Sequence, residues 1–119
     1  MFEIIAPPLD DFISLVIGQG DPAVGAAWPK LVQAKDGASS TKAYSAHDPQ
    51  VQFRILTESN ITSGFKKGWY PFTKTLGKAG ESFAIELREV RNNWAHNGTF
   101  TDDDAYRALD TGERLLKLI

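Results

Sequence analysis

The segment from Glu81 to Asn97, ESFAIELREVRNNWAHN, decides how the rest of this chain is arranged. Its large apolar residues are spaced four, three and four positions apart: Phe83, Leu87, Val90 and Trp94. A helix has about 3.6 residues per turn, so this spacing places all four residues in one stripe. We therefore predict a helix of about four turns whose apolar stripe packs into the core of the protein.

Polar residues occupy the last turns of this predicted helix. A helix that only packs into the core would have Leu or Ala there, because burying polar side chains is unfavourable. Arg91 and His96 are five positions apart, which places them roughly 140° from each other around an ideal helix. Asn97 followed by Gly98 is a C-cap signal, so we expect the helix to end there and the backbone to turn His96. A second copy of the helix, related by a two-fold axis, would bring two copies of Arg91 and two of His96 into one cleft. The spacing thus favours a dimeric site.

The composition limits the class of protein. With 119 residues, 42% of them hydrophobic and none of them cysteine, we expect one globular domain without disulfides over residues 1–119. No apolar run approaches the roughly 18 residues that a membrane span needs, so we expect a soluble protein. The absence of cysteine fits a reducing compartment, so we expect the protein in the cytoplasm. The sequence ends in the apolar residues Leu118-Ile119, without a polar tail. We therefore expect it to be the N-terminal part of a longer protein.

The charges of the chain are unevenly distributed. A net charge of −2 and a pI near 5.6 argue against a general polyanion binder. The stretch from Ser59 to Gly80, however, carries four lysines, four aromatic residues and no acid, which suits single-stranded RNA. Lys66 and Lys67 are the candidate RNA-binding residues of this stretch. In the other interpretation, which burial habits favour, the aromatic residues fill the core and the lysines are solvated.

The remaining sequence predicts an all-α fold, an up-and-down bundle of four to five helices. Pro7 and Pro8 suit a first helical turn, so the first helix is expected over residues 7–17. Asp21-Pro22 pairs an N-cap with a proline and opens a second helix, which Pro29 interrupts with a kink or break near Trp28.

Residues 35–47 are polar and small and predict a long loop. His47 ends this loop, and we interpret it as a flanking residue of the next helix, because no partner residue is spaced to it. Asp48-Pro49 predicts the start of a third helix, which frays by Gly64 or Gly68. Residues 68–80 are expected to form a connector, since Pro71 prevents a regular helix through Tyr70.

The final helix has the clearest beginning. Thr101 is the predicted N-cap, with Asp104 as the acid of a capping box. The predicted inner stripe comprises Ala105, Ala108, Leu109, Gly112, Leu116 and Ile119. Outward ion pairs are expected between Asp103 and Arg107, Asp110 and Arg114, and Glu113 and Lys117. Three consecutive carboxylates on a helix point in three directions, so we interpret residues 102–104 as capping groups and expect no metal site.

Residues 86–116, ELREVRNNWAHNGTFTDDDAYRALDTGERLL, resemble the HEPN superfamily (higher eukaryotes and prokaryotes nucleotide-binding). The defining motif of that superfamily is an Arg, usually a polar residue, and a His after four to six further positions. Arg91, Asn92 and His96 match this motif. The longer run is similar to the branch named after a eukaryotic RNA quality-control endonuclease, which also occurs in prokaryotic defence proteins. The match is good over residues 78–119 and loose before them.

The resemblance implies a dimeric ribonuclease that needs no metal ion or other cofactor, has its site at the shared interface and leaves cyclic-phosphate ends. The chemistry of the residues agrees with this. RNA carries its own nucleophile, the 2′-hydroxyl, so a site needs a base or acid that titrates near neutral pH and a cation for the phosphate. His96 can supply the first and Arg91 the second, while Asn92 can orient the phosphate or His96.

Two functions stay open at this point. One is an endoribonuclease domain of a stress-response or phage-defence protein. The other is a non-catalytic HEPN module for dimerisation or partner docking in a larger ATPase- or helicase-like protein. Arg91 would then pair with a neighbouring carboxylate, and His96 would cap the helix C-terminus. HEPN toxins paired with a nucleotidyltransferase carry a Tyr where this chain has Gly98, so regulation by nucleotidylation is not expected.

Overall fold

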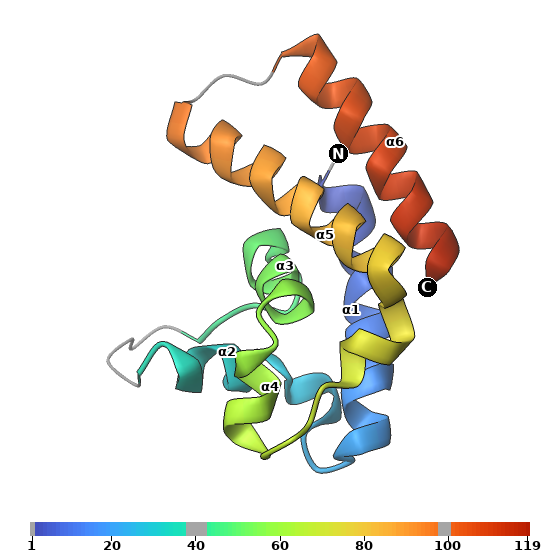
Figure 1. Cartoon of the computed structure of the whole chain (residues 1–119). Helices are drawn as coiled ribbons and strands as arrows, with labels where there is room; N and C mark the ends of the chain where they lie inside the picture. The colour runs from blue at the N-terminus through green and yellow to red at the C-terminus, as the bar shows by residue number, and fades with distance from the viewer. Residues whose placement is uncertain (1, 38–42, 98–100) are drawn as a thin grey trace.

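All the secondary structure that this computed structural model describes is helical (Figure 1). The description covers residues 2–37, 43–97 and 101–119, without the side chains of residues 95–97. The elements are α1 (Phe2–Gly20), the 3₁₀ turn η1 (Gly25–Ala27), α2 (Pro29–Lys35), α3 (Pro49–Thr57), α4 (Asn60–Phe65), α5 (Pro71–Asn97) and α6 (Asp102–Leu118). The predicted all-α class is confirmed, with five helices of seven residues or more and the shorter α4 in the described part.

α5 is the central element, because α1, α3 and α6 all pack against it (Figure 1). It has 27 residues and begins at Pro71 rather than at Glu81. The predicted connector over residues 68–80 is therefore wrong from Pro71 onward. The proline takes the first helical position, where its missing N–H costs no hydrogen bond. Phe72 and Leu76, in the first turns, are buried, and this burial holds the extra turns in place.

The backbone of α5 leaves the helical conformation at Gly77, which has φ 66° and ψ −175°. This region of backbone space is essentially restricted to glycine. A Cβ at Gly77 would meet nothing within 4 Å, so the backbone conformation and not the space requires glycine. Leu76 before the interruption and Ala84 and Leu87 after it are all buried, so both parts of α5 contribute to one core.

α1 begins at Phe2, earlier than the sequence predicts. The expectation that Pro7 and Pro8 form its first turn is wrong, because both lie inside the helix on its exposed side. A proline inside a helix removes a backbone hydrogen bond. The burial of Phe2 and Ile5, one turn apart, offsets this loss by extending the apolar side of α1.

The predicted break near Trp28 is confirmed. Trp28 lies between η1 and α2, its side chain is fully buried, and Pro29 is the first residue of α2. The helix expected directly after Asp21-Pro22 is replaced by a turn and η1. The Asp21 carboxylate accepts a hydrogen bond from the backbone N of Ala23 at 3.1 Å and thereby stabilises this turn.

The third predicted helix is split into α3 and α4. Its start is confirmed, since the Asp48 side chain caps α3 by accepting a hydrogen bond from the backbone N of Gln50 at 3.0 Å. Glu58 ends α3 with a non-helical backbone, φ −97° and ψ 89°. Its carboxylate pairs with both Arg54 and Arg88, and these contacts stabilise the chain at the break.

The start of α6 agrees with the sequence, but its buried side differs in part. Thr101 and Asp104 form the predicted capping box. The buried residues of α6 are Ala108, Thr111, Gly112 and Leu115. Leu109, predicted to face inward, is 53% exposed. The apolar side is rotated because Thr111 turns toward α5, where its hydroxyl donates to Glu86 Oε2 at 3.0 Å.

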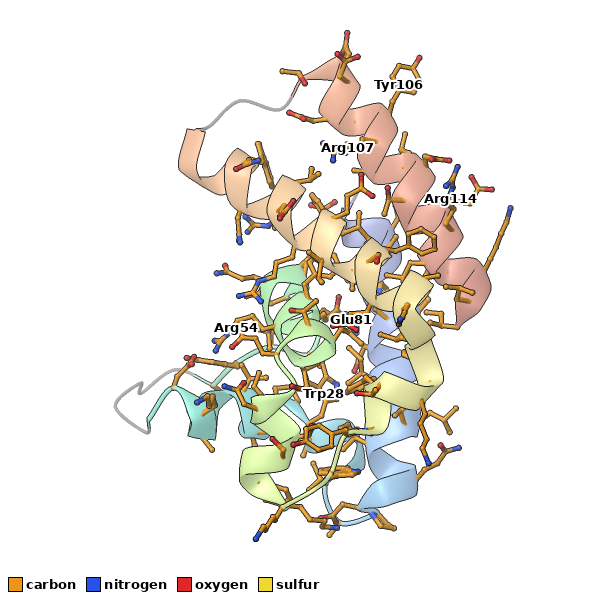
Figure 2. All side chains as sticks on the ribbon, in the orientation of Figure 1. Trp28, Arg54, Glu81, Tyr106, Arg107 and Arg114 are labelled. Carbon is orange, nitrogen blue, oxygen red and sulfur yellow. The ribbon has the colours of Figure 1, made fainter. Side chains whose placement is uncertain are left out.

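Two of the three predicted ion pairs on α6 are present, Asp110 with Arg114 and Glu113 with Lys117. Arg107 pairs instead with Glu86 of α5. Figure 2 shows Arg107 on the side of α6 that faces α5, with Tyr106 on the outer side. The α5–α6 pair is therefore held by polar contacts as well as by apolar packing.

The core lies between α1, α3 and the middle of α5, and its largest fully buried side chains include Trp28, Phe53 and Leu87. Val90 is the last residue of the predicted stripe on α5 that is buried. Trp94, predicted to lie in the core, is 42% exposed, because the C-terminal turns of α5 extend beyond α3 (Figure 1). In the described part of the chain, no helix is long and apolar enough to cross a membrane.

Candidate functional site

The candidate site residues lie on the part of α5 that extends beyond the core. Arg91 and Asn92 are partly buried and lie six and five residues before the helix ends at Asn97. The C-cap signal thus marks the end of α5 correctly. The backbone remains helical through His96, so positions 91 and 96 stay roughly 140° apart around the helix axis. The side chain of His96 lies outside the described part of the structure.

Arg91 packs against an aromatic ring of its own helix. The guanidinium carbon lies 5.2 Å from the centre of the Trp94 ring, a cation–π distance. Within the described residues, Arg91 forms no ion pair with a carboxylate. The alternative function predicts an ion pair between Arg91 and a carboxylate of a neighbouring helix, and the described residues contain no such pair. The Trp94 ring thereby orients the Arg91 guanidinium.

A row of charged side chains connects α5 to α3 and α2, and we call it the charge ladder: Asp36, Arg54, Glu58 and Arg88. Arg88 of α5 pairs with Glu58 at 2.9 Å and donates to Thr57 Oγ1 at 2.9 Å. Glu58 also accepts from Arg54 Nε at 2.9 Å. Arg54 in turn holds both carboxylate oxygens of Asp36, at 2.7 and 2.8 Å. Arg88 precedes Arg91 by one turn on the same side of α5, so the charge ladder fixes the base of the candidate site.

The ion pairs of the charge ladder lower the pKa values of its two carboxylates, Asp36 and Glu58. The hydrogen bonds from Arg54 lower the pKa of Asp36 to about 2. Burial acts to raise the pKa of Glu58, but the hydrogen bond and charge of Arg54, with those of Arg88, outweigh it and leave the pKa below its ordinary value. Both carboxylates therefore remain charged at neutral pH.

Most of the charge ladder cannot be predicted from residue spacing. Arg54 and Glu58 are four positions apart on one helix, and that spacing alone signals an ion pair. Asp36 and Arg54 are 18 positions apart in the sequence, so their bidentate contact depends on the tertiary structure.

The two candidate RNA-binding lysines lie away from Arg91. α4, which precedes them, is at the opposite end of the molecule from the end of α5 (Figure 1). Lys66 Nζ donates to the carbonyl of Gly20 at 3.3 Å, approaches Asp21 at 3.7 Å and lies 5.2 Å from the centre of the Trp69 ring. Lys66 thus neutralises the C-terminal end of α1. Lys67 is exposed.

The aromatic residues around these lysines are divided between core and surface. Phe72 is buried and Trp69 is partly buried, whereas Phe65 and Tyr70 are about half exposed. Neither sequence interpretation describes the whole stretch. The structure does not bring Lys66 and Lys67 together with Arg91, so their contact with RNA stays a prediction.

His47 flanks α3, as the sequence indicates, but it has a partner that the sequence does not reveal. Its Nε2 lies 3.0 Å from Asp10 Oδ2 of α1. The other oxygen of Asp10 accepts from Trp28 Nε1 at 2.9 Å and from Ser14 Oγ at 3.1 Å. The expectation that His47 lacks a partner is wrong, because the fold brings α1 to the end of the loop.

The fold and this geometry together define a class: an all-helical domain with an Arg-Asn pair near the end of its longest helix. The sequence model of the Swt1-like HEPN family matches residues 1–119. The chain therefore belongs to the Swt1-like HEPN family, and the resemblance predicted over residues 78–119 extends to the whole chain. HEPN domains often act as ribonucleases and typically form dimers. Neither curated proteins nor solved structures give a match.

Proposed function

We propose that this domain is a metal-independent endoribonuclease whose site forms where the ends of two α5 helices meet. The observation that carries the proposal is the position of the HEPN motif: Arg91 and Asn92 lie on the turns of α5 that extend beyond the core, where a second copy can approach. A stress-response or phage-defence protein is the setting that we propose for this activity.

The proposed reaction uses the nucleophile of the RNA itself. One His96 removes the proton of a 2′-hydroxyl, and the oxygen attacks the adjacent phosphorus. The bond from phosphorus to the 5′-oxygen breaks, and this oxygen takes up the proton that the same His96 has accepted. The products are a 2′,3′-cyclic phosphate and a 5′-hydroxyl. Arg91 stabilises the negative charge that develops on the phosphate, and Asn92 orients it.

The helix geometry supports a site built from two copies. Positions 91 and 96 face directions roughly 140° apart, so a single α5 presents Arg91 and His96 to different sides. A two-fold axis near the end of α5 allows Arg91 of one copy to approach His96 of the other. The packing of Arg91 on Trp94 reduces the freedom that the guanidinium loses when it binds a phosphate.

The test is cleavage of a panel of tRNA and single-stranded RNA by the whole chain in EDTA. We expect cleavage with cyclic-phosphate ends by the wild type and loss of cleavage in His96→Ala and Arg91→Ala. Arg114→Ala is the matched control, since Arg114 is an exposed arginine on α6 that pairs with Asp110 of its own helix. Unaltered cleavage by the Arg91→Ala, His96→Ala double variant would refute the proposal.

A second candidate function, a non-catalytic dimerisation or docking module of a larger ATPase- or helicase-like protein, is favoured by one observation. Tyr106 and Leu109 on the outer side of α6 are 75% and 53% exposed. Such apolar side chains suit contact with another protein. A tight dimer that neither binds nor cleaves RNA would favour this function, whereas salt-sensitive RNA binding would favour the ribonuclease.

A further inference from the structure

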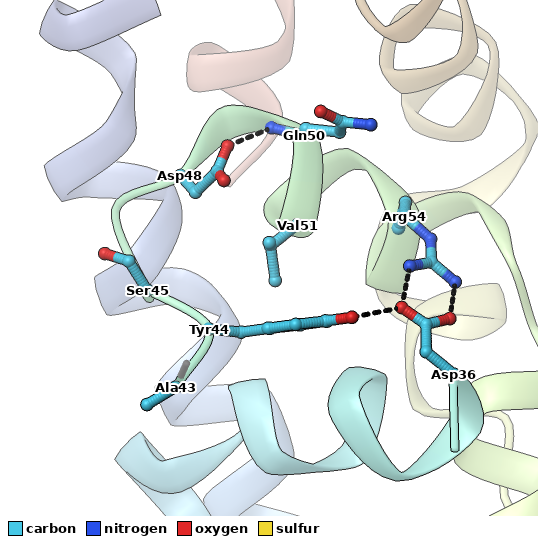
Figure 3. A pocket seen from close by; sticks show the side chains of 8 residues that line it. All are labelled: Asp36, Ala43, Tyr44, Ser45, Asp48, Gln50, Val51 and Arg54. Carbon is cyan, nitrogen blue, oxygen red and sulfur yellow. Dashed lines mark hydrogen bonds and ion pairs between the residues drawn. The ribbon is translucent and has the colours of Figure 1, made fainter. Parts of the chain in front are cut away.

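A cavity of about 490 Å³ opens between α2 and α3, next to the charge ladder (Figure 3). Its volume lies within the range of small-ligand sites, roughly 300–1,000 Å³. One wall is the ring of Tyr44, and the opposite wall belongs to the first turns of α3, with Val51 directed at the ring. The cavity therefore combines a flat aromatic surface with an aliphatic one.

The Tyr44 ring is held in place at both ends. Its hydroxyl donates to Asp36 Oδ2 at 2.6 Å, and its backbone N donates to Gln33 Oε1 at 3.3 Å. Asp36 is itself fixed by the two hydrogen bonds from Arg54. Because a rigid ring loses little freedom when a ligand stacks on it, Tyr44 is a preorganised stacking surface.

The polar part of the lining is rich in acceptors. Asp48 lines the cavity with a carboxylate that accepts the capping hydrogen bond of α3 through Oδ1. The exposed amide of Gln50 adds one donor and one acceptor group beside it. Arg54, the cation of the lining, is engaged by Asp36 and Glu58. A phosphate group would meet unbalanced carboxylate charge here, so the lining suits a planar ligand with N–H donors.

We propose that this cavity binds one nucleobase of an RNA strand, stacked on Tyr44, and that guanine is the preferred base. Guanine presents two adjacent N–H donors, N1–H and the N2 amino group, which a single carboxylate can accept together. Adenine and cytosine place an acceptor beside their amino group, and uracil offers one N–H between two carbonyls. Asp48 therefore discriminates for guanine, while stacking on Tyr44 would accept any base.

The proposal deepens the proposed function, because it takes the base from the RNA substrate of that function. Binding itself is measured without cleavage, so the two can fail separately. Nucleotide binding without RNA cleavage would support the nucleobase site and refute the ribonuclease proposal. RNA cleavage by a chain that binds no nucleotide would support the ribonuclease proposal and refute the nucleobase site.

The experiment is a titration of the whole 15N-labelled chain with GMP, AMP, CMP and UMP, followed by NMR up to millimolar nucleotide. We expect shifts at Tyr44, Asp48 and Val51, with GMP binding at least tenfold more tightly than the other three. Asp48→Asn retains an N-cap of equal quality but replaces one acceptor by a donor. This variant should lose the preference for GMP while remaining folded.

Two further variants test the stacking. Tyr44→Phe keeps the ring and should keep binding, whereas Tyr44→Leu should weaken binding of all four nucleotides at least tenfold. Tyr106→Leu, at an exposed tyrosine on α6, is the matched control and should bind GMP like the wild type. Equal affinity for GMP and AMP, or GMP binding that survives both Tyr44→Leu and Asp48→Asn, would overturn the proposal.

Discussion

At the scale of single residues, the charge ladder shows how a polar contact can hold elements that are distant in sequence. Asp36 follows α2, Arg54 belongs to α3, and their two hydrogen bonds of 2.7 and 2.8 Å form a fork-to-fork ion pair. Tyr44 adds its hydroxyl to the same carboxylate at 2.6 Å. The loop after α2 is therefore tied to α3 by charge as well as by apolar contact.

Asp36 makes the stability of the protein depend on pH in the acid range. Its pKa is depressed in the folded state, so its contribution is fully present above the ordinary value of 3.8 and is lost as the pH falls to about 2. We expect Asp36→Asn to be less stable than the wild type at neutral pH and to lose less stability between about pH 4 and pH 2. Urea unfolding followed by circular dichroism measures both effects.

The control for this prediction is Asp11→Asn, at an exposed carboxylate on α1. It should retain the acid-dependent loss of the wild type. An identical loss of stability in wild type and Asp36→Asn would show that the contact with Arg54 does not shift the pKa of Asp36.

Leu87 and Trp94 belong to one predicted stripe but differ in burial, and their substitution by Ala should differ accordingly. Leu87 is fully buried, so Leu87→Ala should lower the free energy of unfolding by about 2–5 kcal/mol. Trp94 is 42% exposed and lies beyond the core, so Trp94→Ala should lower it by less than about 1 kcal/mol. Urea denaturation of both variants gives the comparison. Equal losses would place Trp94 in the core, as the sequence alone predicted.

At the scale of the elements, α5 depends on one backbone conformation. Gly77 joins its two helical parts with φ 66°, in a region that side chains disfavour. We expect Gly77→Ala to destabilise the protein by about 1–3 kcal/mol. Thermal unfolding followed by circular dichroism measures this loss.

Gly64 offers a matched control for this substitution. It lies inside α4, its φ is not positive, and a Cβ there would also meet nothing within 4 Å. Gly64→Ala should therefore be neutral or stabilise the protein by up to about 1 kcal/mol. Equal effects of the two substitutions would mean that α5 tolerates a regular helix at position 77.

The elements that the sequence predicts well are those defined by local chemistry. The caps at Asp48 and Thr101 need only hydrogen bonds between near neighbours, and Pro29 breaks a helix through its own ring. The starts of α1 and α5 were missed, because they depend on burial of Phe2 and Phe72 against partners elsewhere in the chain. Local sequence signals predict that a helix forms, whereas the length of the helix depends on how many of its residues can be buried against other elements.

The candidate site follows the same division. The motif at Arg91, Asn92 and His96 was identified from the sequence because its spacing belongs to a family, and the family assignment is confirmed. The pairing of Arg91 with Trp94 and the link from Arg88 to Glu58 were not predicted. Both depend on where α5 leaves the core, which the apolar pattern of α5 alone does not indicate.

At the scale of the whole molecule, the proposed dimer predicts that inactive variants can complement each other. An Arg91→Ala subunit retains His96, and a His96→Ala subunit retains Arg91. In a mixed dimer, one of the two sites then contains an intact Arg91 and His96 from different copies. About half of the dimers in an equal mixture are mixed, so we expect up to about a quarter of wild-type cleavage.

This prediction needs a control for subunit exchange, such as native mass spectrometry of one variant carrying a mass label. Mixed dimers without any cleavage would show that both groups must come from one copy. Cleavage by either variant alone would show that the substituted group is dispensable.

The three tryptophans of the chain form a built-in optical series. Trp28 is fully buried, Trp69 is partly buried, and Trp94 is 42% exposed beside Arg91. Trp94 should therefore emit at the longest wavelength of the three and be the first to be quenched by iodide or acrylamide. Any macromolecule that covers the end of α5 shields this ring and shifts its emission to the blue. The protein thus reports occupancy of its own candidate site by fluorescence, without an attached dye.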